Sequence, residues 1–378
     1  SCTRGNAGSP PRCQTPEPLS GWPPALDDRA ASRAYFRAIK RAAHSASART
    51  LPDDDETDLY PVAMQRSTIR PGTVYADPYG HLLVVYHWSP QGLDRPGKLL
   101  AADAQPDGTI GRRRFWPGSF LFSSDTTVVG PGFKAWRPWL PRGDNNWRAL
   151  GNAQLVDHPR FPAFSKAQYA RGKEGFYRRM QALINPWPLP AAAVLTARID
   201  ALHEMVRRRV VSVQNAEDYL AAHPGETIAM PKGKGIFLTA GPWEDFSTPS
   251  RDMRLLIGID TLLSLPREVK SEPGRFGIQR QKRAQVALAL QRQMQAALRA
   301  RHFRYRGSDG EMHQDDLARL VARRAALEMA YNPNDCVEIR WALPPDDPQM
   351  RHCQRHAPAA QLSRMQRYRA WFADRRRP

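Results

Sequence analysis

The four cysteines of this sequence form two local pairs, one near each end of the chain. Cys2 and Cys13 lie close to the start, Cys336 and Cys353 lie close to the end, and no cysteine occurs between them. Four cysteines allow three pairings, and closing a short loop demands little reorganisation of the chain. We therefore expect Cys2–Cys13 and Cys336–Cys353 disulfides, so that each end of the fold is tied locally.

Disulfides persist in oxidising compartments, so we expect a protein exported to the periplasm or the extracellular space. The sequence begins at Ser1 and Cys2 without an initiator methionine, as expected after removal of a signal peptide. A lipidated Cys2 is the alternative interpretation, and it leaves one of the other three cysteines unpaired. No apolar run approaches the roughly 20 residues that span a bilayer, so we expect no transmembrane segment.

The chain has a formal net charge of +19, because 56 Lys and Arg residues outnumber 37 Asp and Glu residues. Arginine is concentrated after Arg275. Guanidinium groups bind carboxylates and phosphates through paired hydrogen bonds, which indicates an anionic polymer as the partner. For an exported protein we expect acidic polysaccharide or peptidoglycan rather than nucleic acid. The alternative is that much of this arginine is solvated surface.

The pattern of residues predicts a helix-rich α+β fold with a small antiparallel sheet in the first third. Residues 1–26 are expected to form an irregular arm tied by its disulfide, residues 27–165 an α+β part, and residues 166–378 a mainly helical part packed on it in one continuous domain. Short β-branched runs at 73–75, 81–88 and 98–103 predict an antiparallel meander. Residues 104–165, rich in aromatic residues, Gly and Pro, are expected to hold little regular structure.

Helices are predicted by apolar residues that recur at spacings of three and four. The expected helices cover 27–44, 167–184, 191–213, 251–264, 279–301, 315–331 and 361–372. The run 227–240 is β-like, residues 336–341 alternate as a strand would, and residues 307–310 (Gly-Ser-Asp-Gly) predict a hairpin-like turn between the last two of the helices that precede residue 336.

Residues 71–108 carry the most suggestive motif. A Gly-His pair ending in His81 opens the second β-run, and Asp103 lies on the third. The segment resembles the His-bearing half of the papain-like NlpC/P60 and CHAP cell-wall hydrolases. That resemblance implies that His81 is the general base and that Asp103 orients its imidazole, because adjacent antiparallel strands place two such side chains about 5 Å apart. The alternative is a histidine with a purely structural role.

The nucleophile implied by the resemblance does not stand at its usual place. These hydrolases carry a cysteine at the start of a helix upstream of the histidine, whereas residues 27–44 contain no cysteine and offer Ser32 instead. In circularly permuted papain-like families the nucleophile follows the histidine, which makes Cys336 a candidate catalytic residue. The alternative for Cys336 is the structural disulfide with Cys353.

Aromatic and charged residues gather in three irregular Gly/Pro-rich segments, 115–120, 132–139 and 241–252, and this combination is typical of sugar recognition. Indole faces stack on pyranose rings while Arg and carboxylate groups bind hydroxyls and uronates. The expected substrate-binding residues are Tyr79, Trp136, Arg137, Trp243, Glu244, Asp245, Arg251 and Asp252. Two of the three carboxylates would suit a glycosidase if they lay about 5 to 9 Å apart. The alternative is that Trp243 packs in the core and Asp252 caps a helix.

We expect no cofactor and no metal. No Gly-rich nucleotide loop follows a strand, and no His, Cys or acidic cluster has the spacing of a zinc or calcium site. Three hypotheses follow. The first is an exported hydrolase with a papain-like site acting on an envelope or extracellular polymer. The second is a carbohydrate-active protein, a glycoside hydrolase or polysaccharide lyase, or a carbohydrate-binding one. The third is a non-catalytic envelope scaffold.

Overall fold

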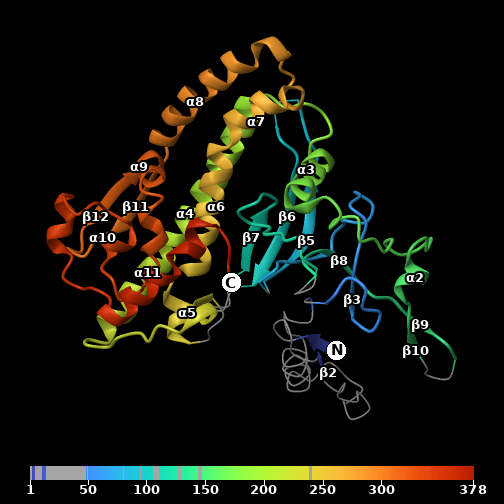
Figure 1. The fold of residues 1–378 in the computed structure, drawn as a ribbon, viewed down its shortest axis with the longest axis horizontal. Coiled ribbons are helices and arrows are strands. Elements are labelled where there is room, and N and C mark those ends of the chain that lie inside the picture. Colours follow the sequence, from blue (N-terminus) through green and yellow to red (C-terminus); the bar gives the residue numbers. More distant parts are fainter. Residues whose placement is uncertain are drawn as a thin grey trace, which may run out of the picture. The chain divides into compact units, whose positions relative to one another are not determined.

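The computed structural model describes residues 2–4, 11–13, 48, 50–79, 81–93, 95–104, 110–126, 130–143, 147–237 and 241–378. The chain divides into two compact units (Figure 1). Unit 1 comprises Ser1–Gln91 with Gly97–Pro186, and unit 2 comprises Gly92–Pro96 with Trp187–Pro378. The predicted α+β class is confirmed, with the sheet in the first third and the helices concentrated afterwards.

Unit 1 is built on a six-stranded antiparallel sheet with strand order β3-β8-β4-β5-β6-β7. The strands are β3 (Leu59–Pro61), β4 (Val74–Ala76), β5 (Leu82–Ser89), β6 (Lys98–Ala104), β7 (Ile110–Arg114) and β8 (Gly132–Trp136). A hairpin of β9 (Trp139–Pro141) and β10 (Trp147–Ala149) follows, then α2 (Asn152–Leu155) and α3 (Gly172–Ile184). The predicted meander is therefore β4-β5-β6, at the centre of the sheet.

The two faces of the sheet carry separate apolar clusters. Tyr75, Leu83 and Phe133 belong to the larger cluster, which is completed by Phe176 and Met180 on one side of α3. Phe122 and Phe176 stack there with ring centroids 3.8 Å apart. The other face buries Ala48, Leu59, Val74 and Ala76. Because α3 completes the larger cluster, it belongs with the sheet, and the compact units divide after this helix rather than at the expected boundary between 165 and 166.

The region 104–165 contains more regular structure than the sequence indicates. Strands β7 and β8 widen the sheet, and β9, β10 and α2 lie in the same region. Strand β7 is polar, with arginines at 112–114, and it is held by pairing with β6 rather than by an apolar pattern. The expected helix at 27–44 lies outside the described residues. Within the arm 1–26, the short strands β1 (Cys2–Arg4) and β2 (Pro11–Cys13) pair with Cys2 opposite Cys13, and the side chains of these strands are not described.

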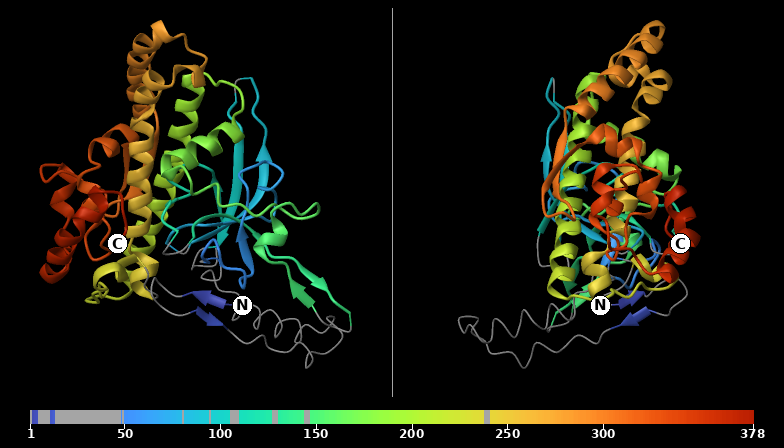
Figure 2. Two further views of the ribbon diagram at one scale, coloured as in Figure 1. Left: turned by 45° about the vertical axis from the view of Figure 1, so that its right-hand side comes forward. Right: turned by 90° about the vertical axis from the view of Figure 1, so that its left-hand side faces the viewer.

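Unit 2 is mainly helical (Figure 2). Helices α4 and α6 pack along one another, and the β11–β12 hairpin follows α8. Its helices are α4 (Ala191–Ala222), α5 (Pro242–Phe246), α6 (Pro249–Leu263), α7 (Leu265–Ser271), α8 (Arg283–Arg299), α9 (Leu317–Ala322), α10 (Val337–Arg340) and α11 (Ala359–Ala373), with β11 (His302–Arg306), β12 (Met312–Asp316) and the 3-10 turns η3 (Gly233–Phe237), η4 (Pro273–Phe276), η5 (Arg280–Lys282), η6 (Ala326–Met329) and η7 (Pro348–His352).

The hairpin-like turn predicted at 307–310 is confirmed, because it joins strands β11 and β12, which lie in the chain between helices α8 and α9. Two other local predictions in unit 2 are wrong. Residues 336–341 contain helix α10 (Val337–Arg340) instead of a strand, because this segment is buried on nearly all sides and its alternation carries no information about a sheet face. The run 227–237 contains the short 3-10 turn η3 and no strand among its described residues. No described helix combines the length and apolarity needed to cross a bilayer.

Candidate active site

His81 and Asp103 come together on one face of the sheet. His81 precedes β5 directly, and Asp103 lies near the end of β6, where the register pairs Val84 with Ala102. This register places the two side chains diagonally across adjacent strands, at the end of the inward-facing row. His81 Nε2 lies 3.2 Å from Asp103 Oδ2. The carboxylate side chain is fully buried, whereas the imidazole is 29 % exposed.

Arg113 on β7 completes a three-strand cluster that the sequence did not reveal. Its Nε and Nη2 atoms lie 2.9 and 2.8 Å from Asp103 Oδ2, and its side chain is only 13 % exposed. The Asp103 carboxylate is therefore held from two sides, by the imidazole and by the guanidinium. Burying this carboxylate is tolerable because the guanidinium compensates its charge. The signal for Arg113 was hidden, since its strand has no apolar alternation.

The turn between β4 and β5 fixes the backbone of His81. Asp77 is fully buried, and its Oδ1 accepts hydrogen bonds from the backbone N–H groups of Tyr79 (2.8 Å) and His81 (2.9 Å). The backbone N–H of Asp77 donates to the carbonyl of His81 at 2.9 Å. Aspartate at this position of a turn commonly binds the backbone two residues ahead. Tyr79, a predicted substrate-binding residue, is half-buried in this turn and lies close to His81 in sequence.

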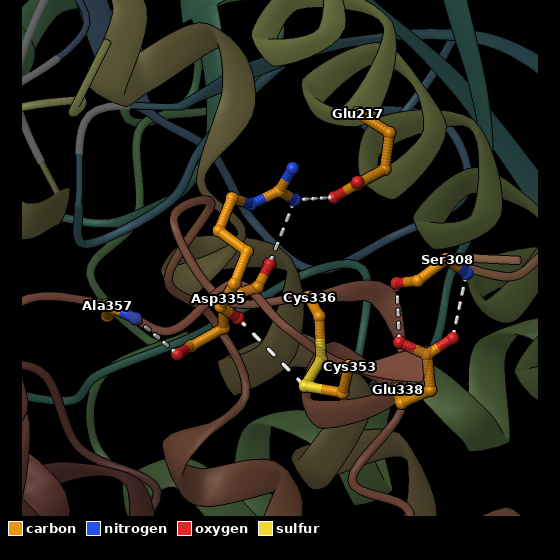
Figure 3. Close-up of a disulfide and its surroundings, with 8 residues drawn as sticks. Glu217, Ser308, Asp335, Cys336, Glu338, Cys353 and Ala357 are labelled. Atoms are coloured by element: carbon orange, nitrogen blue, oxygen red, sulfur yellow. Dashed lines mark hydrogen bonds and ion pairs between the residues drawn. A yellow bond between two sulfur atoms is a disulfide. The ribbon is translucent and has the colours of Figure 1, made fainter. Parts of the chain in front are cut away.

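Cys336 is not available as a nucleophile, because its sulfur is bonded to Cys353 (Figure 3). The Cα atoms of the pair are 5.4 Å apart. The predicted catalytic role is thus wrong for this state of the protein, and the alternative interpretation, a structural disulfide, is confirmed. Figure 3 shows that the Cys336–Cys353 disulfide lies between the side chains of Asp335 and Glu338. The Glu338 carboxylate accepts hydrogen bonds from the backbone N–H and the hydroxyl of Ser308 at 2.8 and 2.6 Å.

The same bridge accounts for the group of described residues that comes nearest to a metal-binding arrangement. Cys336, Glu338 and Cys353 offer one ligand atom each, all within 4.8 Å of one another. Two of these atoms are the bonded sulfurs, and a zinc site needs thiolates. In the oxidised protein the two sulfurs of this cluster therefore form a disulfide cross-link and are not available as metal ligands.

The aromatic segment 132–139 divides into an exposed part and a buried part. Trp136 is 60 % exposed, as a binding residue requires. Arg137 is buried, and the prediction that it binds substrate is wrong. Its guanidinium donates to the carbonyls of Thr57 (2.6 Å) and Leu150 (2.7 Å) and to Asn152 Oδ1 (2.9 Å), so its donors hold neighbouring chain segments together.

Two further tryptophans lie exposed on the β9–β10 hairpin. Trp139 is 54 % exposed and Trp147 is 56 % exposed. The register pairs Trp139 with Ala149 and Pro141 with Trp147, which places both indoles on the same face of the hairpin. The backbone N–H of Leu150 donates to the carbonyl of Pro138 at 3.0 Å and closes its base. Sequence reasoning missed Trp147, because nothing local indicates a strand partner.

The aromatic segment 241–252 does not form the predicted sugar site. Trp243 is 3 % exposed, and its Nε1 donates to the carbonyl of Ile236 at 3.1 Å, so the alternative of core packing is confirmed. Asp252 is fully buried against Arg209, with Nε–Oδ1 and Nη2–Oδ2 distances of 2.6 and 2.9 Å, and cannot act as a glycosidase carboxylate.

The remaining predicted binding residues of this segment lie at the starts of two helices. Glu244 and Asp245 occupy the exposed first turn of α5, and Arg251 is half-buried near the start of α6. Partial burial and the neighbouring Asp245 carboxylate raise the pKa of Glu244 above its ordinary value. The substrate-binding role of these three residues remains a prediction. It no longer has the support of the Trp243 indole and the Asp252 carboxylate, because both are buried.

No protein-family model matches this chain, and neither the curated proteins nor the solved structures contain a match to it. The class defined by the fold is an α+β protein with a helical second unit.

Proposed function

We propose that this protein is an exported hydrolase that acts on a bacterial envelope or extracellular polymer, with His81 as general base and Asp103 as the residue that orients it. The observation that carries the proposal is the 3.2 Å contact between His81 Nε2 and Asp103 Oδ2. A general base needs one ring nitrogen fixed by an acceptor so that the other is correctly protonated and aimed. Asp103 is such an acceptor, and Arg113 keeps it in place.

In this proposal the two ring nitrogens of His81 have different roles. When Nε2–H donates to Asp103, Nδ1 is the nitrogen that accepts a proton. Nδ1 is shielded from solvent, so the proton comes from a group of the protein or from a molecule bound in the site, substrate or water, rather than directly from bulk solvent. In hydrolysis of an amide or ester, this proton leaves the attacking hydroxyl as its oxygen bonds to the carbonyl carbon, and it then passes to the departing amine or alcohol.

Substitution of a candidate residue can identify the nucleophile. The resemblance to papain-like hydrolases puts it on the helix expected at 27–44, where Ser32 is the only hydroxyl-bearing Ser or Thr residue. This segment lies outside the described residues. A Ser32→Ala variant therefore tests whether the attacking oxygen comes from the protein or from a water molecule.

Export and an anionic substrate are supported by two features. The Cys336–Cys353 disulfide is typical of periplasmic and extracellular proteins. The net charge of +19 favours acidic polysaccharide or peptidoglycan as the polymer. Neither feature identifies the bond that is cleaved.

Turnover of purified peptidoglycan and of uronic-acid polysaccharides by the full chain tests the proposal. We expect His81→Ala to lower kcat about a hundredfold, the typical contribution of a general base. His87→Ala is the matched control, because His87 lies exposed on the same strand β5. Equal turnover by His81→Ala and His87→Ala, or no turnover of any polymer by the parent protein, would rule the hydrolase out.

A second candidate function, glycan binding without catalysis, is favoured by the exposed indoles. Trp139 and Trp147 share one hairpin face, and Arg142 and Arg148 are exposed in the same hairpin. Indoles stack on sugar rings and guanidinium groups bind uronate carboxylates. This combination suits an acidic polysaccharide, whether or not the protein cleaves it.

Intrinsic fluorescence titration with acidic oligosaccharides tests this second function. We expect the double variant Trp139→Ala/Trp147→Ala to raise Kd about tenfold, since each aromatic contact contributes about 0.5–1.5 kcal/mol. Trp187→Ala is the control, because Trp187 is equally exposed, at 66 %, but belongs to unit 2. The same Kd for parent and double variant would remove the hairpin from glycan recognition.

A further inference from the structure

Unit 2 contains an open groove between helix α4 and the β11–β12 hairpin, which lie alongside one another (Figure 2). Two adjoining hollows of about 380 and 560 Å³ make it up, and both are lined by Val210, Val211 and Arg304. On α4 the lining extends from His203 to Asp218, which corresponds to about 22 Å of helix. We call this feature the α4–β11 groove.

The floor of the α4–β11 groove is apolar and exposed. Val211 is 57 % exposed and Met312 is 62 % exposed, although both are large apolar side chains. Val210, which is half-buried, and Phe303, which is buried, also line the groove. Apolar side chains gathered in a groove, rather than scattered singly, mark an interaction site. An apolar group that covered them would remove this surface from water.

The walls of the groove are cationic. Arg207 and Arg304 line it, and neither has a carboxylate partner within the described part of the chain; Arg304 donates to Gln314 Oε1 at 3.3 Å. A third arginine, Arg306, pairs with Asp218, the one acidic residue among the lining. The ligand must therefore bring its own negative charge.

We propose that the α4–β11 groove binds an acidic peptide segment that carries apolar side chains between its carboxylates. The guanidinium groups of Arg207 and Arg304, which have no carboxylate partner among the described residues, bind carboxylates in a forked geometry, and Val211 and Met312 receive the apolar side chains. The length of about 22 Å accommodates about six or seven extended residues. A glycan is disfavoured, because the exposed floor is aliphatic and thioether rather than indole or phenol.

Fluorescence anisotropy on the full chain tests the proposal with a labelled octapeptide of alternating Glu and Leu. We expect saturable binding that weakens with salt. The double variant Arg207→Gln/Arg304→Gln is expected to raise Kd at least tenfold. The matched control is Arg283→Gln/Arg292→Gln, which removes the same charge from exposed positions on α8 and is expected to leave Kd unchanged.

A second variant separates specific binding from simple attraction of anions. Val211→Ser removes an exposed apolar side chain without changing the core. We expect it to lower the affinity for the Glu/Leu peptide several-fold. An alternating Glu/Ser peptide is expected to bind poorly to the parent protein and to all variants. Equal affinity for the Glu/Leu and Glu/Ser peptides would overturn the proposal. The proposal would also be overturned if a polyuronate displaced the labelled peptide as effectively as unlabelled Glu/Leu peptide does. The same holds if the α8 control variant lost as much affinity for the peptide as Arg207→Gln/Arg304→Gln. None of these outcomes depends on His81 or on hydrolysis.

Discussion

Asp252→Asn is expected to lower the free energy of unfolding of unit 2 by about 3–5 kcal/mol, the cost of removing one partner of a buried ion pair. Asp252 on α6 and Arg209 on α4 are both fully buried, and two hydrogen bonds of 2.6 and 2.9 Å join them. Thr248 Oγ1 donates to the same carboxylate at 3.0 Å. The substitution keeps the shape of the side chain and removes only its charge.

A second buried guanidinium makes the loss large. Arg340 is fully buried, and within the described chain it has no carboxylate in ion-pair contact. Burial, with a smaller contribution from Arg209, lowers its pKa to about 9, while the carboxylates of Glu217 and Asp252 act in the opposite direction. Without Asp252, two cationic side chains share one apolar interior, where unpaired charge is costly.

Urea unfolding combined with hydrogen exchange of α4 and α6 measures this effect in unit 2 itself. The matched control is Asp200→Asn, because Asp200 pairs with Arg301 at the surface, with both side chains more than 40 % exposed. Such pairs contribute at most about 1 kcal/mol. The double variant Arg209→Met/Asp252→Asn should be more stable than Asp252→Asn alone. If its loss of unfolding free energy equalled the sum of the losses in Arg209→Met and Asp252→Asn, the two residues would not be coupled.

The centre of the sheet could be predicted from the sequence, and its edges could not. Leu83 and Val85 alternate with outward residues in β5, and the neighbouring runs have the same character. Strand β7 has no such pattern, because it is an edge strand whose residues 112–114 are all arginine. The apolar run of strand β8 is interrupted by Lys134, a charged residue that is nevertheless fully buried. Pairing with neighbours decides both strands, and that information is not local.

The candidate site was predictable to the same extent. The contact of His81 with Asp103 follows from two adjacent strands that the sequence reveals, whereas Arg113 lies on the strand that it conceals. The sequence cannot tell an exposed indole from a buried one. Trp136 and Trp243 both occur beside Pro, Gly and charged residues, yet only the first faces solvent, because tertiary packing decides burial.

Lys134→Met is expected to lower the free energy of unfolding of unit 1 by about 2–4 kcal/mol. The Lys134 ammonium donates to the carbonyls of Ala48 (2.7 Å) and Thr50 (3.0 Å) and to the Thr50 hydroxyl (2.8 Å). Methionine fills the space but donates no hydrogen bond, so two buried carbonyls lose their partner, and each such loss costs about 1–3 kcal/mol. Urea unfolding with hydrogen exchange of β8 gives the measurement.

The pH dependence of the same pair of proteins tests the protonation state of Lys134. Burial lowers its pKa from 10.5 to about 7, and the Asp54 carboxylate opposes this shift. Between pH 7 and pH 10.5 the unfolded chain then binds more protons at this residue than the folded one, so the stability of the parent protein rises with pH by up to about 1.4 kcal/mol per pH unit. Lys134→Met lacks the group, and the difference in stability between the parent and the variant should grow across this range.

A difference that stays constant from pH 7 to pH 10 would contradict the lowered pKa. Three oxygens surround the amine, and an ammonium donates to all three, whereas a neutral amine donates only two protons. Burial and hydrogen bonding therefore act in opposite directions on this one side chain. A constant difference would mean that the three acceptors keep Lys134 charged and that residues 48 and 50 are held to β8 by an ammonium at every pH in that range.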